Sequence, residues 1–560
     1  MDDIRRQRTE LENHLIDELI SGRLTRREFV RRGTVMGMSI PLLGAIVAAC
    51  GGANDTGGSS AASGGTGGSS GSVKPGGTVR AAVIVPTGAI NPVTVGDQGG
   101  IVMLGQTGEF LCITDPKTLE LKPALAQSWT PNSDATEWTF KLQSGVTFQD
   151  GSPMTADDVV YTMDLLSDPK GTSNALSAFK GVLTKGGTTA VDDQTVKFTL
   201  EAATGNFPYL VSRDNYNAII IKKGYDPADF EKTFLGTGPF KLDKYTPKVG
   251  ASFVRNDDYW GATKANPDRV EFTFYEDEGP QILALQGKQV DVVGQISVSG
   301  GRAILSDPSY NILDIPSTAH RQVHMRNDKE PFTDKRVRQA IALSLDRNAI
   351  IQQLFEGKAK VGNDSPFASV YPSTNPSVPQ REQNIDQAKQ LLSDVALSSA
   401  SVKMNVEKAF EIPDYAVLIQ NSAKQIGFTI DIFQQSQTQY YGDFTFGGSP
   451  WLDSTMGITD YGHRSVPNVF LGAPLLSDGT WNSAHFKNST YDSLVKQYNA
   501  AADIQSQQGI AKQIQELLLD ETPIIFAYFY DYLGATAGNV GGVTITPIGH
   551  VQLEAAGFTS

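Results

Sequence analysis

Apolar and polar residues alternate along several segments of the chain after residue 77. Residues 78–86 are rich in β-branched side chains, and residues 138–142 and 428–432 place an apolar side chain at every second position. A period of two predicts strands with one buried face. Residues 523–529 are almost continuously apolar, which predicts a buried strand.

Other segments repeat their apolar residues at helical spacing. One helix is expected after Thr155, which can cap it, and should end before Pro169. A second run starts near residue 332 and restarts at Asp346, and a third covers residues 413–426 and ends at Gly427. A last run covers residues 491–519. Helices that alternate with strands predict an α/β fold.

The first fifty residues have the pattern of an export signal. Arg26, Arg27 and Phe29 precede an uncharged run over residues 33–49, which ends at Cys50. The run is shorter than the ~20 apolar residues of a spanning helix. Residues 1–49 therefore predict a signal peptide of the twin-arginine type. The alternative is a hydrophobic N-terminal helix of a cytoplasmic protein with an incidental cysteine.

Small residues before Cys50 resemble a bacterial lipobox, which implies that the Cys50 thiol is acylated and anchors the protein to a membrane. Residues 50–77 then consist mainly of Gly, Ser, Ala and Thr, a composition that stays flexible. We expect an exported protein at the outer face of the cytoplasmic membrane or in the periplasm, held by a lipid and a tether.

The charge and the reactive residues exclude several classes of function. A net charge of −14 argues against nucleic acid as a partner. His320 and His324 lie in an extended segment without an acidic neighbour, so no metal and no cofactor are predicted. The chain has no nucleophile elbow and no phosphate loop, so we expect no enzyme and no catalytic residues. Cys112 lies in an apolar run and should be structural.

Most of residues 77–535 resembles the extracytoplasmic solute-binding proteins, family 5, of oligopeptide, dipeptide and nickel ABC importers. The stretches that carry this resemblance include Leu121-Lys-Pro-Ala-Leu-Ala-Gln-Ser-Trp129, Thr155-Ala-Asp-Asp-Val159, Gly236-Thr-Gly-Pro-Phe240, Arg255-Asn-Asp-Asp-Tyr-Trp-Gly261 and Leu285-Gln-Gly-Lys-Gln-Val-Asp291. Their order also agrees with the family.

The resemblance implies a two-lobed periplasmic-binding-protein-like fold, type II in its large cluster C form, with a hinge between the lobes. By analogy lobe I takes residues 78–324 and 521–560, with an added subdomain at about 106–205. Lobe II takes residues 325–520. The implied function is capture of a solute in the cleft by a monomer, which delivers it to the permease and ATPase of an importer.

One loop of lobe II resembles the part of peptide-binding members that holds the peptide amine. Asp460 matches the acidic residue there, although its distance to Pro467 is longer than in the family. Arg464 could bind a ligand carboxylate, and Tyr441, Trp451 and Tyr461 could form flat apolar walls. Alternatively, Asp460 and Arg464 pair with each other and the aromatic residues pack in the core.

A peptide is the favoured solute, and oligosaccharides and metal chelates are the alternatives within the same class of importer. A different class of function is also open, because a lipoprotein with this fold could act as a peptide receptor or chaperone without import. The sequence does not separate uptake from sensing.

Overall fold

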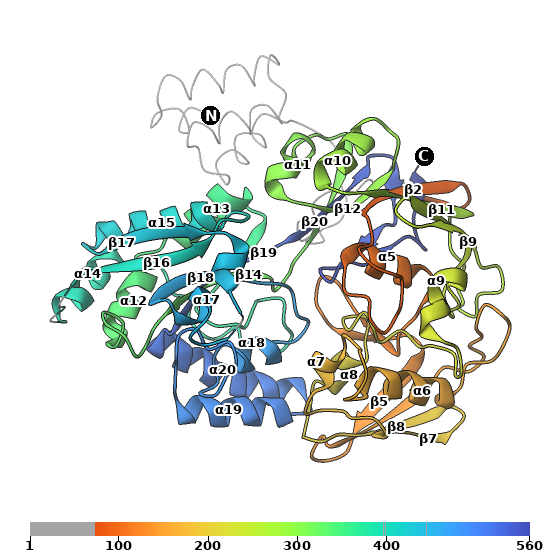
Figure 1. Ribbon diagram of the computed structural model, residues 1–560, viewed down its shortest axis with the longest axis horizontal. Helices are drawn as coiled ribbons and strands as arrows, with labels where there is room; N and C mark the ends of the chain where they lie inside the picture. Colours follow the sequence, from red (N-terminus) through yellow and green to blue (C-terminus); the bar gives the residue numbers. More distant parts are fainter. Residues whose placement is uncertain (1–72, 396, 398, 444, 560) are drawn as a thin grey trace, which may run out of the picture. The chain divides into compact units, whose positions relative to one another are not determined.

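The computed structural model describes residues 73–395, 397, 399–443 and 445–559. The predicted signal peptide, with Arg26, Arg27 and Phe29, and the predicted lipidation residue Cys50 lie outside the described residues. Contacts divide the chain into Met1–Gly67 and Gly68–Ser560, and the second unit contains all the described elements. Within it, the two largest sheets each form the centre of one lobe (Figure 1).

The sheet of the first lobe has seven strands of mixed direction. Its central pairs, β2 with β11 and β2 with β12, are parallel, and the outer pairs are antiparallel. In spatial order its strands are β13 (Tyr310–Ile315), β20 (Tyr532–Ala537), β12 (Val292–Ile296), β2 (Thr78–Ile84), β11 (Arg269–Tyr275), β10 (Gly250–Arg255) and β9 (Phe240–Thr246). β2 is thus the strand that the sequence predicts within residues 78–86.

The sheet of the second lobe has six strands. β16 runs parallel to both of its neighbours, β17 and β18, whereas β14 is antiparallel to β18 and β19. In spatial order the strands are β15 (Ala359–Val361), β19 (Ile524–Tyr530), β14 (His320–Met325), β18 (Met456–Tyr461), β16 (Ser401–Glu407) and β17 (Thr429–Gln435). The apolar run from residue 523 is β19, which is buried along nearly all its length.

The chain crosses between the two sheets twice. It passes from β13 to β14 through residues 316–319 and returns from β19 to β20 through Asp531. The predicted boundaries at 324 and 521 placed β14 and β19 in lobe I, but both strands pair in the sheet of the second lobe. This placement was wrong because strand pairing, rather than the local pattern, decides to which sheet a strand belongs.

A separate four-stranded antiparallel sheet lies within residues 106–205, where the sequence predicts an added subdomain. Helix α6 (Ala156–Ser167) packs on this sheet. Its strands are, in spatial order, β5 (Ala126–Pro131), β6 (Glu137–Leu142), β8 (Thr195–Thr199) and β7 (Thr188–Asp192). The smaller sheets contain β1 (Val73–Lys74), β24 (Gly557–Thr559) and β21 (Val540–Gly541), β3 (Cys112–Thr114) and β4 (Leu121–Pro123), and β22 (Thr544–Ile545) and β23 (Val551–Gln552).

Polar caps fix the ends of the predicted helices. The backbone N–H of Thr155 donates to Asp158 in the first turn of α6, and the Asp346 carboxylate accepts from the N–H of Ala349 in α13 (Arg347–Phe355). Gly427, with φ +79°, follows α15 (Ile412–Gln425) in the left-handed region. The run over residues 491–519 forms two helices, α19 (Ser489–Ala500) and α20 (Ile504–Glu521), because Asp503 caps a new helix by accepting from the N–H of Ser506.

The remaining helices cover the sheets and connect their strands. In the first lobe they are α5 (Gln98–Thr107), α7 (Leu176–Phe179), α8 (Phe207–Leu210), η1 (Pro227–Asp229), α9 (Phe230–Thr233), α10 (Glu278–Gln286) and α11 (Val298–Leu305). In the second lobe they are α12 (Lys335–Leu343), α13 (Arg347–Phe355), α14 (Ile385–Ser393), α15 (Ile412–Gln425), α16 (Gln437–Tyr441), α17 (Pro450–Asp453), α18 (Asn468–Gly472), α19 (Ser489–Ala500) and α20 (Ile504–Glu521).

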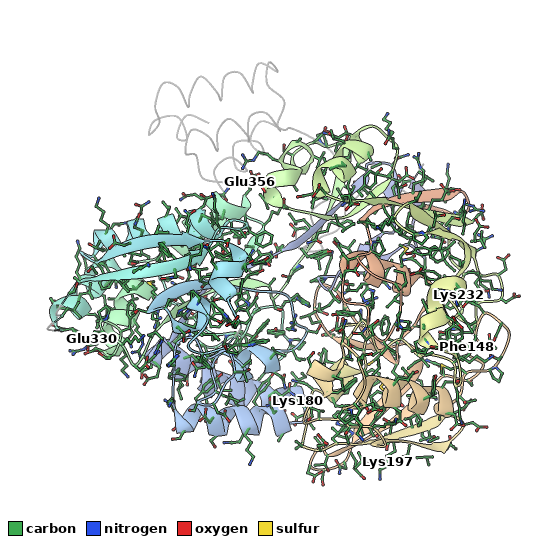
Figure 2. All side chains as sticks on the ribbon, viewed as in Figure 1. Phe148, Lys180, Lys197, Lys232, Glu330 and Glu356 are labelled. Carbon is green, nitrogen blue, oxygen red and sulfur yellow. The ribbon has the colours of Figure 1, made fainter. Side chains whose placement is uncertain are left out.

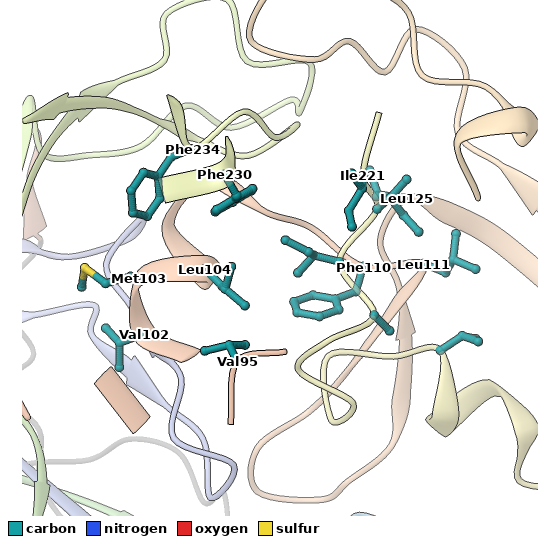
Figure 3. Packing of buried hydrophobic residues seen from close by; sticks show 14 of the residues in the cluster. Val95, Val102, Met103, Leu104, Phe110, Leu111, Leu125, Ile221, Phe230 and Phe234 are labelled. Carbon is teal, nitrogen blue, oxygen red and sulfur yellow. The ribbon is translucent and has the colours of Figure 1, made fainter. Parts of the chain in front are cut away.

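Each lobe has its own apolar core, and many charged side chains lie at the periphery. Figure 3 shows part of the first core, where Leu104, Phe110, Phe230 and Phe234 are buried together. The exposed Lys232, Glu330 and Glu356 lie at the edges of the molecule in Figure 2.

Cys112 belongs to the first core and is fully buried. Its thiol lies 3.2 Å from the carbonyl oxygen of Pro208, and burial raises its pKa well above the ordinary value. A buried thiol with a raised pKa is unreactive, in line with the structural role expected from the sequence.

Candidate ligand-binding site

Three carboxylates gather at one edge of the second sheet. Because β16 and β18 are parallel, their carboxyl ends meet at the same edge, where Glu407 ends β16 and Asp460 lies near the end of β18. Glu411 follows β16 and precedes helix α15. Ligands of open α/β sheets bind beyond the carboxyl ends of parallel strands, so this edge is a candidate site.

Arg321 lies among these carboxylates and is directly opposite Asp460 in the register of β14 and β18. Its Nε is 3.0 Å from Glu411 Oε1, and its Nη1 donates both to Asp460 Oδ1 and, over 2.9 Å, to the Tyr530 hydroxyl. The guanidinium also lies over the Tyr530 ring, 4.6 Å from its centroid. Asp460 therefore pairs with Arg321, and the alternative ion pair with Arg464 does not form among the described residues.

The cluster holds more negative than positive charge. Burial works against the Arg321 cation, but Tyr530, Glu411 and Asp460 outweigh it and raise its pKa. Burial raises the pKa of Asp460 and of Glu407, and Asp460 raises that of Glu407 further. The Asp460 side chain keeps 29% of its surface exposed. A cationic group of a ligand can therefore reach it and offset the surplus negative charge.

A cavity of about 500 Å³ lies between residues of the two lobes. Arg464, Val469 and Trp481 line it from the second lobe, and Tyr209, Asp214 and Tyr216 line it from the first. This volume lies within the range of about 300–1,000 Å³ that is typical of small-ligand sites. Of the five residues predicted to bind a ligand, Arg464 lines this cavity.

Opposite charges face this cavity from the two lobes. The Arg464 side chain is exposed, and its Nη1 donates to the carbonyl oxygen of His463 over 2.7 Å. Arg464 has no ion pair in the described part of the chain. Asp214 accepts from Thr114 Oγ1 over 3.0 Å, and burial raises its pKa. Arg464 can therefore bind a ligand carboxylate without breaking an existing ion pair.

The predicted aromatic residues form a packed layer behind the site. Tyr461 stacks on His320 at 5.6 Å between ring centroids, and Tyr441 lies 5.7 Å from Trp451. Tyr461 and Trp451 are only 8% and 3% exposed. Trp481, which the sequence analysis missed, contacts both of them and lines the cavity. In this structure Tyr461 and Trp451 therefore pack in the interior, which was the alternative to their lining a ligand site.

In the part of the chain that the structure describes, neither the histidines nor the helices indicate a metal site or a membrane span. Burial lowers the pKa of His320 to about 3 and that of His324 to about 4, so both are neutral in β14. Over the described ranges, no group of three His, Cys, Asp or Glu side chains could hold a metal ion. Among the same residues, no helix is long and apolar enough to cross a membrane.

Comparisons with known proteins agree with this architecture. A family model described as "Bacterial extracellular solute-binding proteins, family 5 Middle" matches residues 120–462. Dipeptide-binding protein DppE of Bacillus subtilis is 26% identical over 475 residues, which cover 78% of this chain and 84% of DppE. Heme-binding protein A of Haemophilus influenzae is 25% identical over 467 residues, which cover 77% of this chain and 83% of that protein.

A solved structure has the same fold. HbpA2 from Haemophilus parasuis superposes with a TM-score of 0.77 at 22% identity, covering 86% of this chain and 100% of HbpA2.

Proposed function

The chain belongs to family 5 of the bacterial extracellular solute-binding proteins, and on this premise we propose that it captures a peptide between its two lobes for an ABC importer. The surplus of negative charge around Asp460 is the observation that carries this proposal. The dipeptide-binding relative supports it. The proposed role is binding and delivery, and it requires no chemical step on the solute.

The charges fit the two ends of a peptide. Asp460 is partly exposed and lies beside Glu411, so it can pair with a peptide ammonium group although it already contacts Arg321. Arg464, in the inter-lobe cavity, can bind a carboxylate with two hydrogen bonds. Trp481 and Tyr216 offer flat surfaces for the side chains in between.

The mature protein should act at the membrane surface as a monomer. We propose that the Arg26-Arg27 signal directs its export, and that a lipid on Cys50 then holds it outside the cell near the permease and ATPase of its importer. Replacement of Cys50 by Ser should release the protein from the membrane fraction. Retention of the Cys50→Ser protein in that fraction would contradict the lipid anchor.

The identity of the solute can be tested by native mass spectrometry of protein purified without added ligand. We expect a copurified peptide. Isothermal titration with the corresponding synthetic peptide should then show that Asp460→Asn weakens binding by about tenfold or more, because the ammonium group loses its charged partner. The N-acetylated peptide should bind both proteins equally weakly.

Asp431→Asn is a matched control, because Asp431 is exposed on β17 of the same sheet. This variant should bind the free peptide like the unaltered protein. Unchanged affinity of the Asp460→Asn protein would remove Asp460 from the site, and copurification of an oligosaccharide or a metal chelate would contradict the peptide proposal.

A further inference from the structure

A second cavity, of about 420 Å³, lies within the first lobe. Its walls come from the end of α5, the β3–β4 region, the 259–266 loop that follows β10, and the C-terminal segment around residues 550–555. None of the five predicted ligand-binding residues lines it. The charged residues Glu109, Arg213, Lys264 and Glu554 do.

Arg213 is a buried cation with an unused donor. It is 4% exposed, and its Nη2 donates to the carbonyl oxygen of Thr114 over 2.7 Å. Its Nε has no hydrogen-bond partner in the described part of the chain, and no described carboxylate lies within ion-pair distance of the guanidinium. Burial accordingly lowers its pKa. An unpaired buried guanidinium is costly, so a ligand that supplies an anion would stabilise this position.

Glu554 is the complementary group in the same cavity. Burial raises its pKa, and its own backbone N–H is the one hydrogen-bond donor to its carboxylate within the described ranges. The Arg213 charge lowers the Glu554 pKa, but the two groups form no ion pair among these residues. Besides the exposed Lys264, the cavity therefore holds one cation and one anion, Arg213 and Glu554, that form no ion pair among the described residues.

The Glu109 carboxylate, by contrast, already accepts hydrogen bonds from three side chains. Its carboxylate accepts from the Tyr259 hydroxyl over 2.6 Å, from Trp260 Nε1 over 2.8 Å and from Thr237 Oγ1 over 2.8 Å. These bonds hold the two aromatic rings as a fixed wall of the cavity. Because its acceptor sites are occupied, Glu109 orders the site and leaves Glu554 to meet a ligand.

We propose that this first-lobe cavity binds a small zwitterion of the size of a free amino acid, with its carboxylate on Arg213 and its ammonium group on Glu554. A simple anion or a simple cation would satisfy one of the two buried groups and leave the other unpaired. A molecule with both charges satisfies them together. Tyr259 and Trp260 flank the remaining volume, and Lys264 lies beside them.

Isothermal titration of the mature protein with glycine, L-alanine, L-glutamate and L-lysine tests this proposal. At least one of them should bind, whereas acetate and glycine amide, which lack one of the two charges, should bind about tenfold or more weakly. No heat of binding from any amino acid at millimolar concentration would overturn the proposal and leave a water-filled cavity.

Two variants locate the binding site. Glu554→Gln keeps the shape of the side chain and should weaken binding by about tenfold. Thr263→Trp adds bulk from an exposed loop residue that lines the cavity, so it should also reduce binding without removing a buried charge. Circular dichroism should show that both variants are folded.

Two controls separate this site from the cleft. Glu276→Gln removes an exposed acid of the first lobe and should leave binding unchanged. Asp460→Asn should weaken peptide binding, as proposed above, but leave amino-acid binding unchanged. If Asp460→Asn weakens amino-acid binding and Glu554→Gln does not, the amino acid binds in the cleft and the first-lobe site is wrong.

Discussion

Arg321 and Arg213 are almost equally buried, with 3% and 4% of their surfaces exposed, yet their surroundings have opposite effects. Two carboxylates and a tyrosine hydroxyl contact Arg321 and raise its pKa. Among the described residues, the Arg213 guanidinium donates to a single backbone carbonyl oxygen, and burial lowers its pKa. Burial alone therefore does not tell whether a charge is part of the scaffold or ready for a ligand, whereas its contacts do.

Secondary structure explains this difference. Arg321 lies on β14, whose antiparallel pairing with β18 fixes Asp460 opposite it, and the parallel neighbour β16 leads to Glu411. Arg213 follows the short helix α8 in an irregular segment, so no strand pairing places a carboxylate beside it. A regular sheet thus supplies partners for a buried charge that an irregular segment leaves unpaired.

The largest expected change in stability comes from removing Arg321, the buried cation that contacts two carboxylates. Arg321→Met leaves the partly buried carboxylates of Asp460 and Glu411 without their partner, which should lower the free energy of unfolding by about 3–5 kcal/mol. Denaturant unfolding followed by circular dichroism measures this change. Arg302→Met is the control, because Arg302 is exposed on α11 and its ion pair with Glu356 should be worth less than about 1 kcal/mol. An equal loss of unfolding free energy in Arg321→Met and Arg302→Met would contradict the view that contacts with buried carboxylates make Arg321 part of the scaffold.

A third site, around Asp531, tests whether equal numbers of opposite charges are enough to keep a buried carboxylate ionised. The Asp531 side chain is fully buried between the two sheets, beside the partly exposed Asp314, and Lys360 and Lys358 pair with these two carboxylates. Burial raises the pKa of Asp531 to about 6, so the folded state holds this proton more tightly than the unfolded state. The stability from Asp531 is therefore complete below its ordinary pKa of about 4 and is lost as the pH rises towards 6.

Asp531→Asn should remove this loss, which amounts to about 3 kcal/mol across the interval. The measurement is the free energy of unfolding from pH 4 to pH 7, taken as the difference between the unaltered protein and the variant. Asp431→Asn, with its exposed side chain, should leave the pH profile unchanged. If the free energy of unfolding of Asp531→Asn changes with pH in the same way as that of the unaltered protein, then the two lysines fully compensate both carboxylates.

Arg213→Met should have a smaller effect than Arg321→Met, because it removes a buried charge that has no ion pair among the described residues. The expected loss is no more than about 1 kcal/mol, because the lost hydrogen bond to the Thr114 carbonyl oxygen is offset by the removal of an unfavourable buried charge. The same unfolding measurement applies. A loss as large as that of Arg321→Met would mean that Arg213 is as well paired as Arg321, and the contrast would fail.

A similarly small effect should come from removing one neutral contact of Arg321. Tyr530→Phe keeps the ring over Arg321 but removes the hydroxyl that accepts from Nη1, which should cost about 0.5–1.5 kcal/mol. Tyr275→Phe serves as the control, because the Tyr275 hydroxyl makes no hydrogen bond in the described part of the chain. A loss above that range would show that the tyrosine, rather than the carboxylates, stabilises the cation.

The helix ends and the strands were predictable because their signals are local. Thr155, Asp346 and Gly427 mark helix ends by their own chemistry, and alternation marks β6 and β17. The exchange of strands between the sheets was not predictable in the same way. Residues 316–319 and Asp531 look like any connection until the pairing of β14 with β19 is known.

The candidate site was predictable in part. The resemblance led to Asp460, but its partner Arg321 lies 139 residues earlier in the chain, and only the register of β14 and β18 brings them together. A charged residue inside an otherwise buried strand was the signal that could have identified Arg321. The first-lobe cavity has no such signal, because its charges come from segments around residues 213 and 554 that are unrelated in sequence.

The double crossing between the sheets makes the second lobe an insertion within the first. His320 and Phe529 are paired residues of neighbouring strands, so the segment between them starts and ends at the same place. Such a segment could have been acquired by a gene for the first lobe as one continuous piece, and it could be excised or exchanged between relatives by joining two adjacent ends. The protein can thus be viewed as a host domain and a guest domain that share two strand connections.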